Sequence, residues 1–431
     1  MKNFCCRIIW VITLPLVMQS QIKVDQDRLE ARIFKLAEFG LQDNGETERV
    51  AFSNADIAAR AWVIEQMKAM DLETSIDFAG NITGIRKGRE GSRKPIAFGS
   101  HIDRVPNGGN YDGCVGAMAA LEVIQTLNEN NIKTRHPLEV IIFSNEEGGV
   151  MGSRAIAGHL GENALNVVNS TGYSMGEGIA RIGGDVSRIA EVAREPGSLT
   201  AFLELHIEQG GILDTERTDI GIVEGIVGLK WWEVEFTGFA NHAGTTPMDM
   251  RQDALLAAAK FIIAVNEITI SYDGKQVGTV GRIEARPGAP NVIPGKVVTS
   301  LEIRDLSSEV ISRLFRDIDQ KAREIAAVSG VNIKFHPLDT TADPALTDPS
   351  IQNQIEGIAT TLGLSFKKMQ SGAGHDAQDM ALIAPTGMIF VPSKDGISHS
   401  PKEFTSAEDM ADGANVLMHT ILALDKKPDK P

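Results

Sequence analysis

The stretch from Gly99 to Glu122 concentrates residue types that bind metal ions. His101 and Asp103 end an apolar run, and Asp112 follows a glycine-rich turn. Imidazole nitrogens and carboxylate oxygens are ligands of zinc and similar divalent cations. Asp112 has two oxygens and could bridge two ions, while Asp103 could accept a hydrogen bond from His101 and fix its ring. The alternative is a surface loop, where Asp, Asn and Gly are common turn formers.

Two adjacent carboxylates, Glu146 and Glu147, follow a second apolar run at Leu138–Phe143. Like charges repel in a cleft, so such a pair is ordinarily a solvated turn. Beside a metal, one carboxylate can be a ligand while its neighbour takes a proton from water and returns it to a leaving nitrogen. We assign Glu147 as ligand and Glu146 as general base, although spacing alone does not decide between them.

Two further histidines could complete a dinuclear site. His206 follows an apolar run and His399 lies in a Ser/Gly-rich segment. A lone histidine is more often a core or surface residue than a ligand. Two ions that share Asp112 need about two more protein ligands each. His101 with His206, and Glu147 with His399, would supply that number.

Strands and helices must position these residues. Apolar, β-branched runs alternate with amphipathic segments such as Asp25–Leu41. This alternation predicts an α/β fold with a mixed, largely parallel sheet covered by helices. Because ligand groups gather at the carboxyl ends of strands in such sheets, His101 and the Glu146–Glu147 pair can converge.

Beyond Asp214 the pattern changes. The chain alternates predicted strands at 220–227, 231–236, 277–285 and 297–303 with predicted helices at 251–267 and 307–327. This β-α-β-β-α-β order predicts an inserted, ferredoxin-like α+β domain. We expect a metal-binding domain of residues 21–214 and 340–431, and an inserted second domain of residues 215–339.

The first 20 residues stand apart from the rest of the 431-residue chain. Lys2 and Arg7 precede an apolar run, Ile8–Met18, that is too short to span a bilayer. This pattern resembles a signal peptide with a poor cleavage site, and we expect export to the periplasm or medium. The alternative is a buried N-terminal helix in a cytoplasmic protein. Cysteine usage does not decide, since a mature chain would keep only Cys114.

The net charge of −15 argues against nucleic acid or an anionic membrane as a partner and favours a soluble protein. We expect a small-molecule substrate, no nucleic acid and no membrane span in the mature chain.

Several ordered motifs resemble the metal-dependent amidohydrolases of the hydantoinase/carbamoylase family, within the aminoacylase/carboxypeptidase-type metallopeptidase clan. The resemblance extends from roughly residue 48 to residue 424 and rests on GSHIDRVPNGGNYDG, SNEEGG, LELHIEQGGIL, GFANHAGTTPMDMRQDA, APNVIPGKV, SGAGHDA and GISHSP. It implies a phosphorylase/hydrolase-like fold for the catalytic domain. It also implies one metal held by His101, Asp112 and His206, and another held by Asp112, Glu147 and His399. The ions would be zinc, with manganese or cobalt as alternatives, and Glu146 matches the catalytic base.

The same resemblance implies a substrate site and a homodimer. Four residues match substrate-binding positions: Gln209, His242, Asn291 and Arg304. Arg304 suits a substrate carboxylate, although a surface ion pair is the usual role of such a residue. His242 could donate to the oxyanion of a tetrahedral intermediate, and backbone N–H groups near Gly374 could touch substrate. In the family the inserted domain serves as lid and dimer interface, so the resemblance implies a lid and dimerisation domain of residues 215–339 beside a catalytic domain of residues 21–214 and 340–431. A partner's lid residues can help to complete each site.

We therefore expect hydrolysis of a ureido C–N bond, most directly in an N-carbamoyl-L-amino acid. The alternatives are an allantoate- or ureidoglycolate-type amidohydrolase, an aminoacylase or dipeptidase on the same scaffold, and a catalytically dead binding protein. A binding protein without activity would not need the general base Glu146. One departure concerns side-chain preference: many family members have a longer segment with an Arg-Phe pair after the glutamates, whereas here Gly148–Ser153 follows directly.

Overall fold

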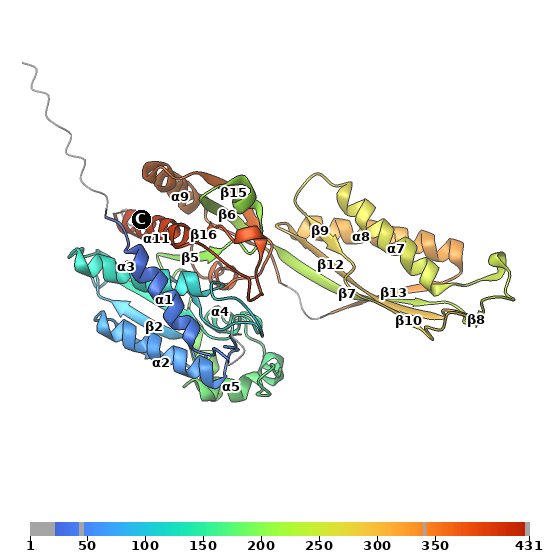
Figure 1. Cartoon of the computed structure of the whole chain (residues 1–431), viewed down its shortest axis with the longest axis horizontal. Coiled ribbons are helices and arrows are strands. Elements are labelled where there is room, and N and C mark those ends of the chain that lie inside the picture. Colours follow the sequence, from blue (N-terminus) through green and yellow to red (C-terminus); the bar gives the residue numbers. More distant parts are fainter. Residues whose placement is uncertain (1–21, 43–46, 339–341, 427–431) are drawn as a thin grey trace, which may run out of the picture.

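The computed structural model describes residues 22–42, 47–338 and 342–426. The chain forms two lobes, each built on its own sheet (Figure 1). The predicted signal peptide, residues 1–20, lies outside the described residues. Within the described ranges, every helix is too short or too polar to cross a membrane.

The larger lobe holds a nine-stranded sheet in the order β1-β2-β4-β3-β5-β16-β6-β14, with β15 beside β6. Its strands are β1 (Glu73–Ile76), β2 (Ile82–Arg86), β3 (Ile96–His101), β4 (Leu138–Phe143), β5 (Ala201–Ile207), β6 (Ile220–Ile226), β14 (Ala345–Leu346), β15 (Phe366–Ser371) and β16 (Thr386–Val391). The four central strands, β4-β3-β5-β16, are parallel to one another, and antiparallel pairs lie outside them. The predicted mixed, largely parallel sheet is confirmed.

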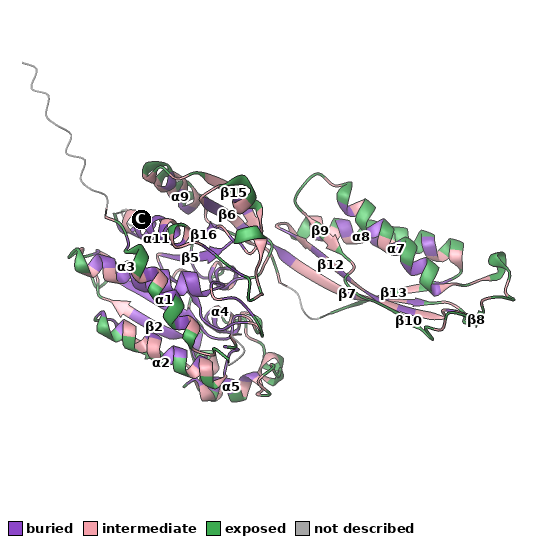
Figure 2. Cartoon of the chain, in the orientation of Figure 1, coloured by how far each residue is buried: buried purple, intermediate pink, exposed green. Residues whose placement is uncertain are grey.

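Helices cover both faces of this sheet. One face carries α1 (Gln26–Glu38), α2 (Asn54–Ala69), α3 (Cys114–Glu129), α9 (Pro349–Leu362) and α11 (Ala407–Lys426), and the other carries α4 (Met151–Ile156) and α10 (Asp376–Met380). A hydrophobic core lies on each face of the sheet, and alternate side chains of β4 pack in the two cores. Val140 and Ile142 pack on the α3 side, and Ile141 and Phe143 pack on the α4 side. Burial on both faces explains why Val140–Phe143 is a continuous apolar run. Figure 2 shows buried residues along α3 and β5 at the centre of the larger lobe.

Short helical segments fill the connections of the two lobes. They are η1 (Glu162–Asn166), α5 (Met175–Arg181), η2 (Val186–Val192), α6 (Ile212–Glu216), η3 (Met248–Met250) and η4 (Lys394–Gly396).

The smaller lobe has an antiparallel sheet in the order β10-β12-β7-β13, with β9 also beside β12. Its elements are β7 (Gly228–Thr237), α7 (Ala254–Ile270), β9 (Val277–Thr279), β10 (Ile283–Arg286), β12 (Lys296–Asp305), α8 (Ser308–Ser329) and β13 (Asn332–Pro337). This connectivity and strand order are those of a ferredoxin-like fold. A two-stranded ribbon of β8 (Asn241–His242) and β11 (Val292–Ile293) extends from the far end of the lobe (Figure 1).

Two details differ from the sequence-based expectations. The strand expected at 277–285 is divided into β9 and β10, because the N–H of Gly281 donates to the Ser300 hydroxyl instead of to a ladder carbonyl (3.1 Å). The strand at 220–226, which we assigned to the inserted domain, pairs within the larger sheet. The chain changes sheets at Val227, and only strand pairing, not strand composition, distinguishes the two sheets.

Helix α3 must lie close to β5 to bring Asp112 to the sheet, and Gly116 makes this approach possible. A Cβ at Gly116 would lie 2.0 Å from the backbone oxygen of Leu205. We predict that Gly116→Ala lowers the melting temperature, with an overpacking penalty of about 1–3 kcal/mol, despite the better helix propensity of Ala. The control is Gly357→Ala in α9, whose added Cβ meets nothing within 4 Å and should be neutral or stabilising. Equal shifts in thermal unfolding would contradict the prediction.

Candidate metal centre and active site

The candidate residues gather at the carboxyl ends of three adjacent parallel strands. His101 is the last residue of β3, Glu146 and Glu147 follow β4, and His206 is next to last in β5. Because β4, β3 and β5 are neighbours and run in the same direction, their ends meet at one edge of the sheet. Asp112 lies at the turn into α3, and His399 comes from the loop before α11.

The two oxygens of Asp112 face two different groups. Its Oδ1 lies 3.2 Å from His206 Nε2 and 3.7 Å from His101 Nε2. Its Oδ2 lies 3.2 Å from His399 Nε2, which in turn lies 3.6 Å from a Glu147 oxygen. Within each group of three, the ligand atoms all lie within 4.8 Å of one another. The structure thus brings together the five predicted ligands as two triads that share Asp112.

These residues fit divalent cations. The Nε2 atom of His101 is buried without a hydrogen-bond partner, although an unpaired buried polar atom is costly. Burial lowers the pKa of His101 to about 4, so the ring is neutral and its nitrogen lone pair is free to bind a metal. Burial, followed by the neighbouring Asp112 carboxylate, raises the pKa of Glu147 to about 8. Cations at the triads would offset this crowding of negative charge.

Glu146 is placed to act as a base beside the triads. Its carboxylate lies 3.6 Å from His101 Nε2 and is almost fully buried. Burial raises the pKa of Glu146 well above its usual range, and the Asp376 and Glu147 carboxylates add to the effect. A carboxyl group with a raised pKa can both accept a proton and return it near neutral pH.

Asp103 supports the site differently from the sequence-based expectation. The His101 Nδ1 atom is within hydrogen-bond reach of the backbone oxygen of Asp103 (3.2 Å), whereas the carboxylate lies 3.7 Å away. That carboxylate accepts the backbone N–H groups of Glu146 (3.3 Å) and Glu147 (3.2 Å). N–H groups just past the end of β4 have no ladder partner, so Asp103 orients the glutamate pair and its own carbonyl orients the histidine.

Glu204 is a supporting residue that sequence reasoning missed. It lies two residues before His206 on β5, and its buried carboxylate accepts the Ser100 hydroxyl (2.7 Å) and the Ala377 N–H (2.8 Å). Glu204, His206 and the buried His375 form a third group with ligand atoms within 4.8 Å. Because both Glu204 oxygens are already hydrogen-bonded, the residue fits a supporting role. The available signal was its period-two spacing from His206, which puts both side chains on one face of the strand.

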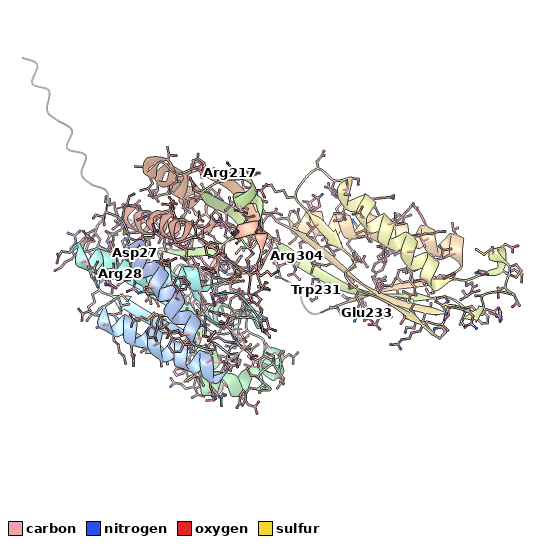
Figure 3. All side chains as sticks on the ribbon, viewed as in Figure 1. Asp27, Arg28, Arg217, Trp231, Glu233 and Arg304 are labelled. Carbon is pink, nitrogen blue, oxygen red and sulfur yellow. The ribbon has the colours of Figure 1, made fainter. Side chains whose placement is uncertain are left out.

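Gln209 contacts the triads through Asp112, whereas Arg304 is paired with a glutamate of the same strand. The Gln209 amide donates to Asp112 Oδ2 (2.7 Å). The Arg304 guanidinium, on β12 where the lobes meet, makes two hydrogen bonds to Glu302 (2.8 and 3.1 Å) (Figure 3). It also donates to the backbone oxygen of Gly372 (2.6 Å), in the turn that contains Gly374. A substrate carboxylate at Arg304 would therefore share the guanidinium with Glu302.

His242 and Asn291 are close to each other but apart from the triads. His242 pairs with Val292 in the β8–β11 ribbon, and the Ala243 N–H donates to the Asn291 carbonyl (3.0 Å). The ribbon lies at the end of the smaller lobe that points away from the larger one, and His242 is exposed (Figure 1). A single chain therefore does not bring these two predicted substrate residues to the metal ligands.

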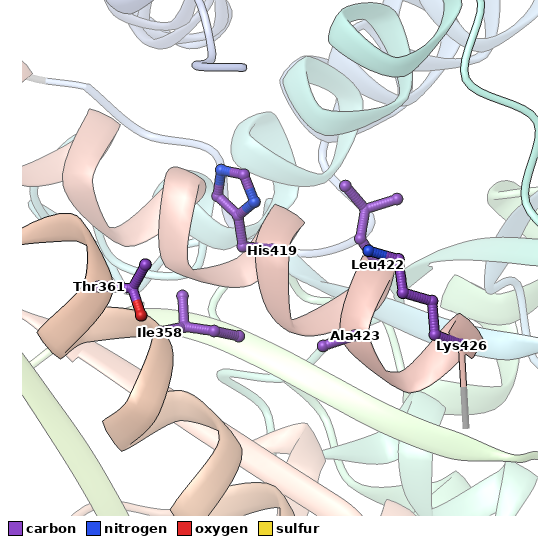
Figure 4. A pocket seen from close by; sticks show the side chains of 6 residues that line it. All are labelled: Ile358, Thr361, His419, Leu422, Ala423 and Lys426. Carbon is purple, nitrogen blue, oxygen red and sulfur yellow. The ribbon is translucent and has the colours of Figure 1, made fainter. Parts of the chain in front are cut away.

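A surface groove between α9 and α11 is separate from this centre (Figure 4). It is lined by Ile358, Thr361, His419, Leu422, Ala423 and Lys426. The His419 ring is within hydrogen-bond reach of the Ile22 carbonyl (3.0 Å), and none of the predicted site residues lines the groove.

Residues 97–423 match peptidase family M20/M25/M40, and the chain belongs to this metal-dependent family. It is 40% identical to an N-carbamoyl-L-amino acid amidohydrolase of Geobacillus stearothermophilus, over 93% of this chain and 99% of that protein. It is 37% identical to a ureidoglycolate hydrolase of Arabidopsis thaliana, over 94% and 88% of the two chains. The fold matches a hydantoinase/carbamoylase family amidase of Burkholderia multivorans with a TM-score of 0.88 and 36% identity, over 95% of this chain and 100% of the other. The predicted family resemblance is confirmed.

We predict that zinc or manganese added to chelator-treated protein raises its melting temperature, because a ligand of the folded state stabilises it by mass action. Asp112→Asn should lose most of this shift, since both triads share that carboxylate. Asp425→Asn is the control: this buried carboxylate accepts the N–H groups of Arg135 and His136 at the opposite end of β4. A metal-induced shift that survives in Asp112→Asn as fully as in Asp425→Asn would contradict the assignment.

Proposed function

We propose that this chain hydrolyses a C–N bond of the ureido group of an N-carbamoyl-L-amino acid, with two divalent cations, zinc or alternatively manganese or cobalt. The observation that carries the proposal is the pair of ligand triads that share Asp112, with Glu146 beside them. The similarity to an N-carbamoyl-L-amino acid amidohydrolase along almost the whole chain supports the same reaction. Attack by water would release ammonia and leave the N-carboxy amino acid, which loses carbon dioxide to give the free amino acid, so that one water is consumed overall.

The metal ligands, Glu146, Gln209 and Arg304 would each have a separate role in the reaction. Cations bound at the triads would polarise the ureido carbonyl and lower the pKa of water. Glu146 would take the proton from the attacking water and deliver it to the departing nitrogen. Gln209, which reaches Asp112, would orient the ureido group, and Arg304 would bind the substrate carboxylate in competition with Glu302.

A related ureido acid is the second candidate substrate, because the chain also resembles a ureidoglycolate hydrolase at 37% identity. Both substrate classes place a carboxylate near a ureido group, so both would use Arg304. The loop of Gly148–Ser153, directly after Glu147, is the element that would distinguish side chains.

We also propose a homodimer in which the partner subunit's His242 reaches each site. In the described chain His242 is exposed and remote from the triads, so a donor for the oxyanion must come from elsewhere. Helix α7 presents an exposed apolar stripe of Leu256, Ile263 and Ile270, which are 49%, 58% and 72% exposed. Their spacing of seven residues puts them on one helix face, as an interface requires.

The reaction is tested with a panel of N-carbamoyl-L-amino acids, allantoate, ureidoglycolate, N-acetyl amino acids and dipeptides. We expect ammonia from ureido acids, and Glu146→Gln should keep its metals while losing on the order of a hundredfold or more in kcat. Near-normal turnover by metal-loaded Glu146→Gln would remove Glu146 from the mechanism. Activity confined to acyl amino acids or dipeptides would replace the proposal with an aminoacylase or dipeptidase.

The shared site is tested by mixing two inactive variants, Glu146→Gln and His242→Ala, under conditions of subunit exchange. A mixed dimer has one site with an intact Glu146 and an intact His242 from the partner. Random pairing of equal amounts should therefore restore about a quarter of wild-type activity. No recovery in dimers shown to have exchanged subunits would place His242 in its own chain's site or outside the mechanism.

A further inference from the structure

Glu403 lies next to the candidate metal ligands and hydrogen-bonds to two segments that are far apart in the sequence, the turn before α3 and the loop before α11. Its Oε1 atom accepts the backbone N–H groups of Tyr111 (2.8 Å) and Asp112 (3.0 Å). Its Oε2 atom accepts the hydroxyl of Ser398 (2.9 Å), the residue before His399. The side chain is only 5% exposed, so these hydrogen bonds are shielded from competing water.

The two segments approach so closely that the turn before Asp112 needs a glycine. A Cβ at Gly109 would lie 2.2 Å from Glu403 Oε1. The ring of Phe404 packs edge-on against Tyr111, with centroids 5.7 Å apart. The loop before α11 is thus held against the Asp112 turn by a carboxylate and by an aromatic pair.

This contact bears directly on one triad. The Ser398 hydroxyl that meets Glu403 also lies 3.0 Å from Asp112 Oδ2, the oxygen that faces His399 and Glu147. The His399 side chain is half exposed, and its backbone has a φ of +52°, an unfavourable value for a residue other than glycine. A half-exposed ligand on strained backbone depends on the loop around it. In contrast, His101 and His206 are buried on β3 and β5.

We propose that Glu403 is a positioning residue that sets the geometry of the Asp112–Glu147–His399 triad and thereby its metal affinity, while the His101–Asp112–His206 triad depends on it much less. The inference rests on the proposed function for the presence of two cations, and it adds a residue that controls the two positions unequally. Groups that orient metal ligands commonly change affinity by about 10–100-fold when they are removed.

The test compares Glu403→Ala with Asp425→Ala by calorimetric titration of metal-free protein with Zn²⁺ or Mn²⁺. Each variant removes a buried carboxylate that accepts two backbone N–H groups, those of Tyr111 and Asp112 or those of Arg135 and His136. Both variants should therefore have a lower melting temperature than the wild-type chain. Only Glu403→Ala should weaken the binding of one metal equivalent, by about 10–100-fold, with the other equivalent nearly unchanged. Glu403→Gln keeps an acceptor for both N–H groups and should recover part of the lost affinity.

Two results would overturn the inference. One is equal metal affinity in Glu403→Ala and Asp425→Ala, and the other is a wild-type chain that binds a single equivalent. If Glu403→Ala does not fold, Gly109→Ala and Glu403→Gln are compared with Asp425→Ala in the same titration. Wild-type metal affinity in both of these variants would also overturn the inference. Because the readout is metal binding, these failures are distinct from a failure of ureido hydrolysis. A wild-type chain that binds two metals but releases no ammonia would leave the role of Glu403 intact.

Discussion

The shared carboxylate of Asp112 is the constraint on which the site depends. One buried group faces both triads, with one oxygen toward His101 and His206 and the other toward His399 and Glu147. Four segments from distant parts of the chain therefore meet around a single side chain. The parallel strands bring His101, Glu147 and His206 together, since their carboxyl ends meet at one edge of the sheet. Packed loops must position Asp112 and His399.

Several buried acids around Asp112 accept hydrogen bonds from backbone N–H groups. Asp103 accepts two N–H groups after β4, Glu403 accepts two before α3, and Glu204 accepts one at the start of α10. Such bonds satisfy backbone donors that secondary structure leaves unpaired, and they fix the loops that carry the ligands. A carboxylate beside a metal ligand can thus be essential to the geometry without touching the metal.

The two lobes contribute different groups to the proposed site. The larger lobe contains all the triads and Glu146, whereas Arg304, His242 and Asn291 come from the smaller lobe. Arg304 lies where the lobes meet and contacts the turn at Gly372. The ribbon with His242 and Asn291 points away, so the substrate residues of one chain are divided between its own site and, in the proposed dimer, that of its partner.

Residue type and spacing along the chain predicted the family, the parallel sheet and the five candidate ligands, because these motifs follow apolar strands that are recognisable locally. Local pattern could not show that β6 belongs to the larger sheet, since both sheets use similar strands. It could not show that Asp103 binds the N–H groups of Glu146 and Glu147, or that Glu302 occupies the Arg304 guanidinium. The local sequence pattern could not indicate the role of Glu403, because its partners, Tyr111 and Asp112, lie about 290 residues away along the chain. Which polar group meets which is decided by tertiary packing, since a hydrogen bond depends on distance in space and not on separation in sequence.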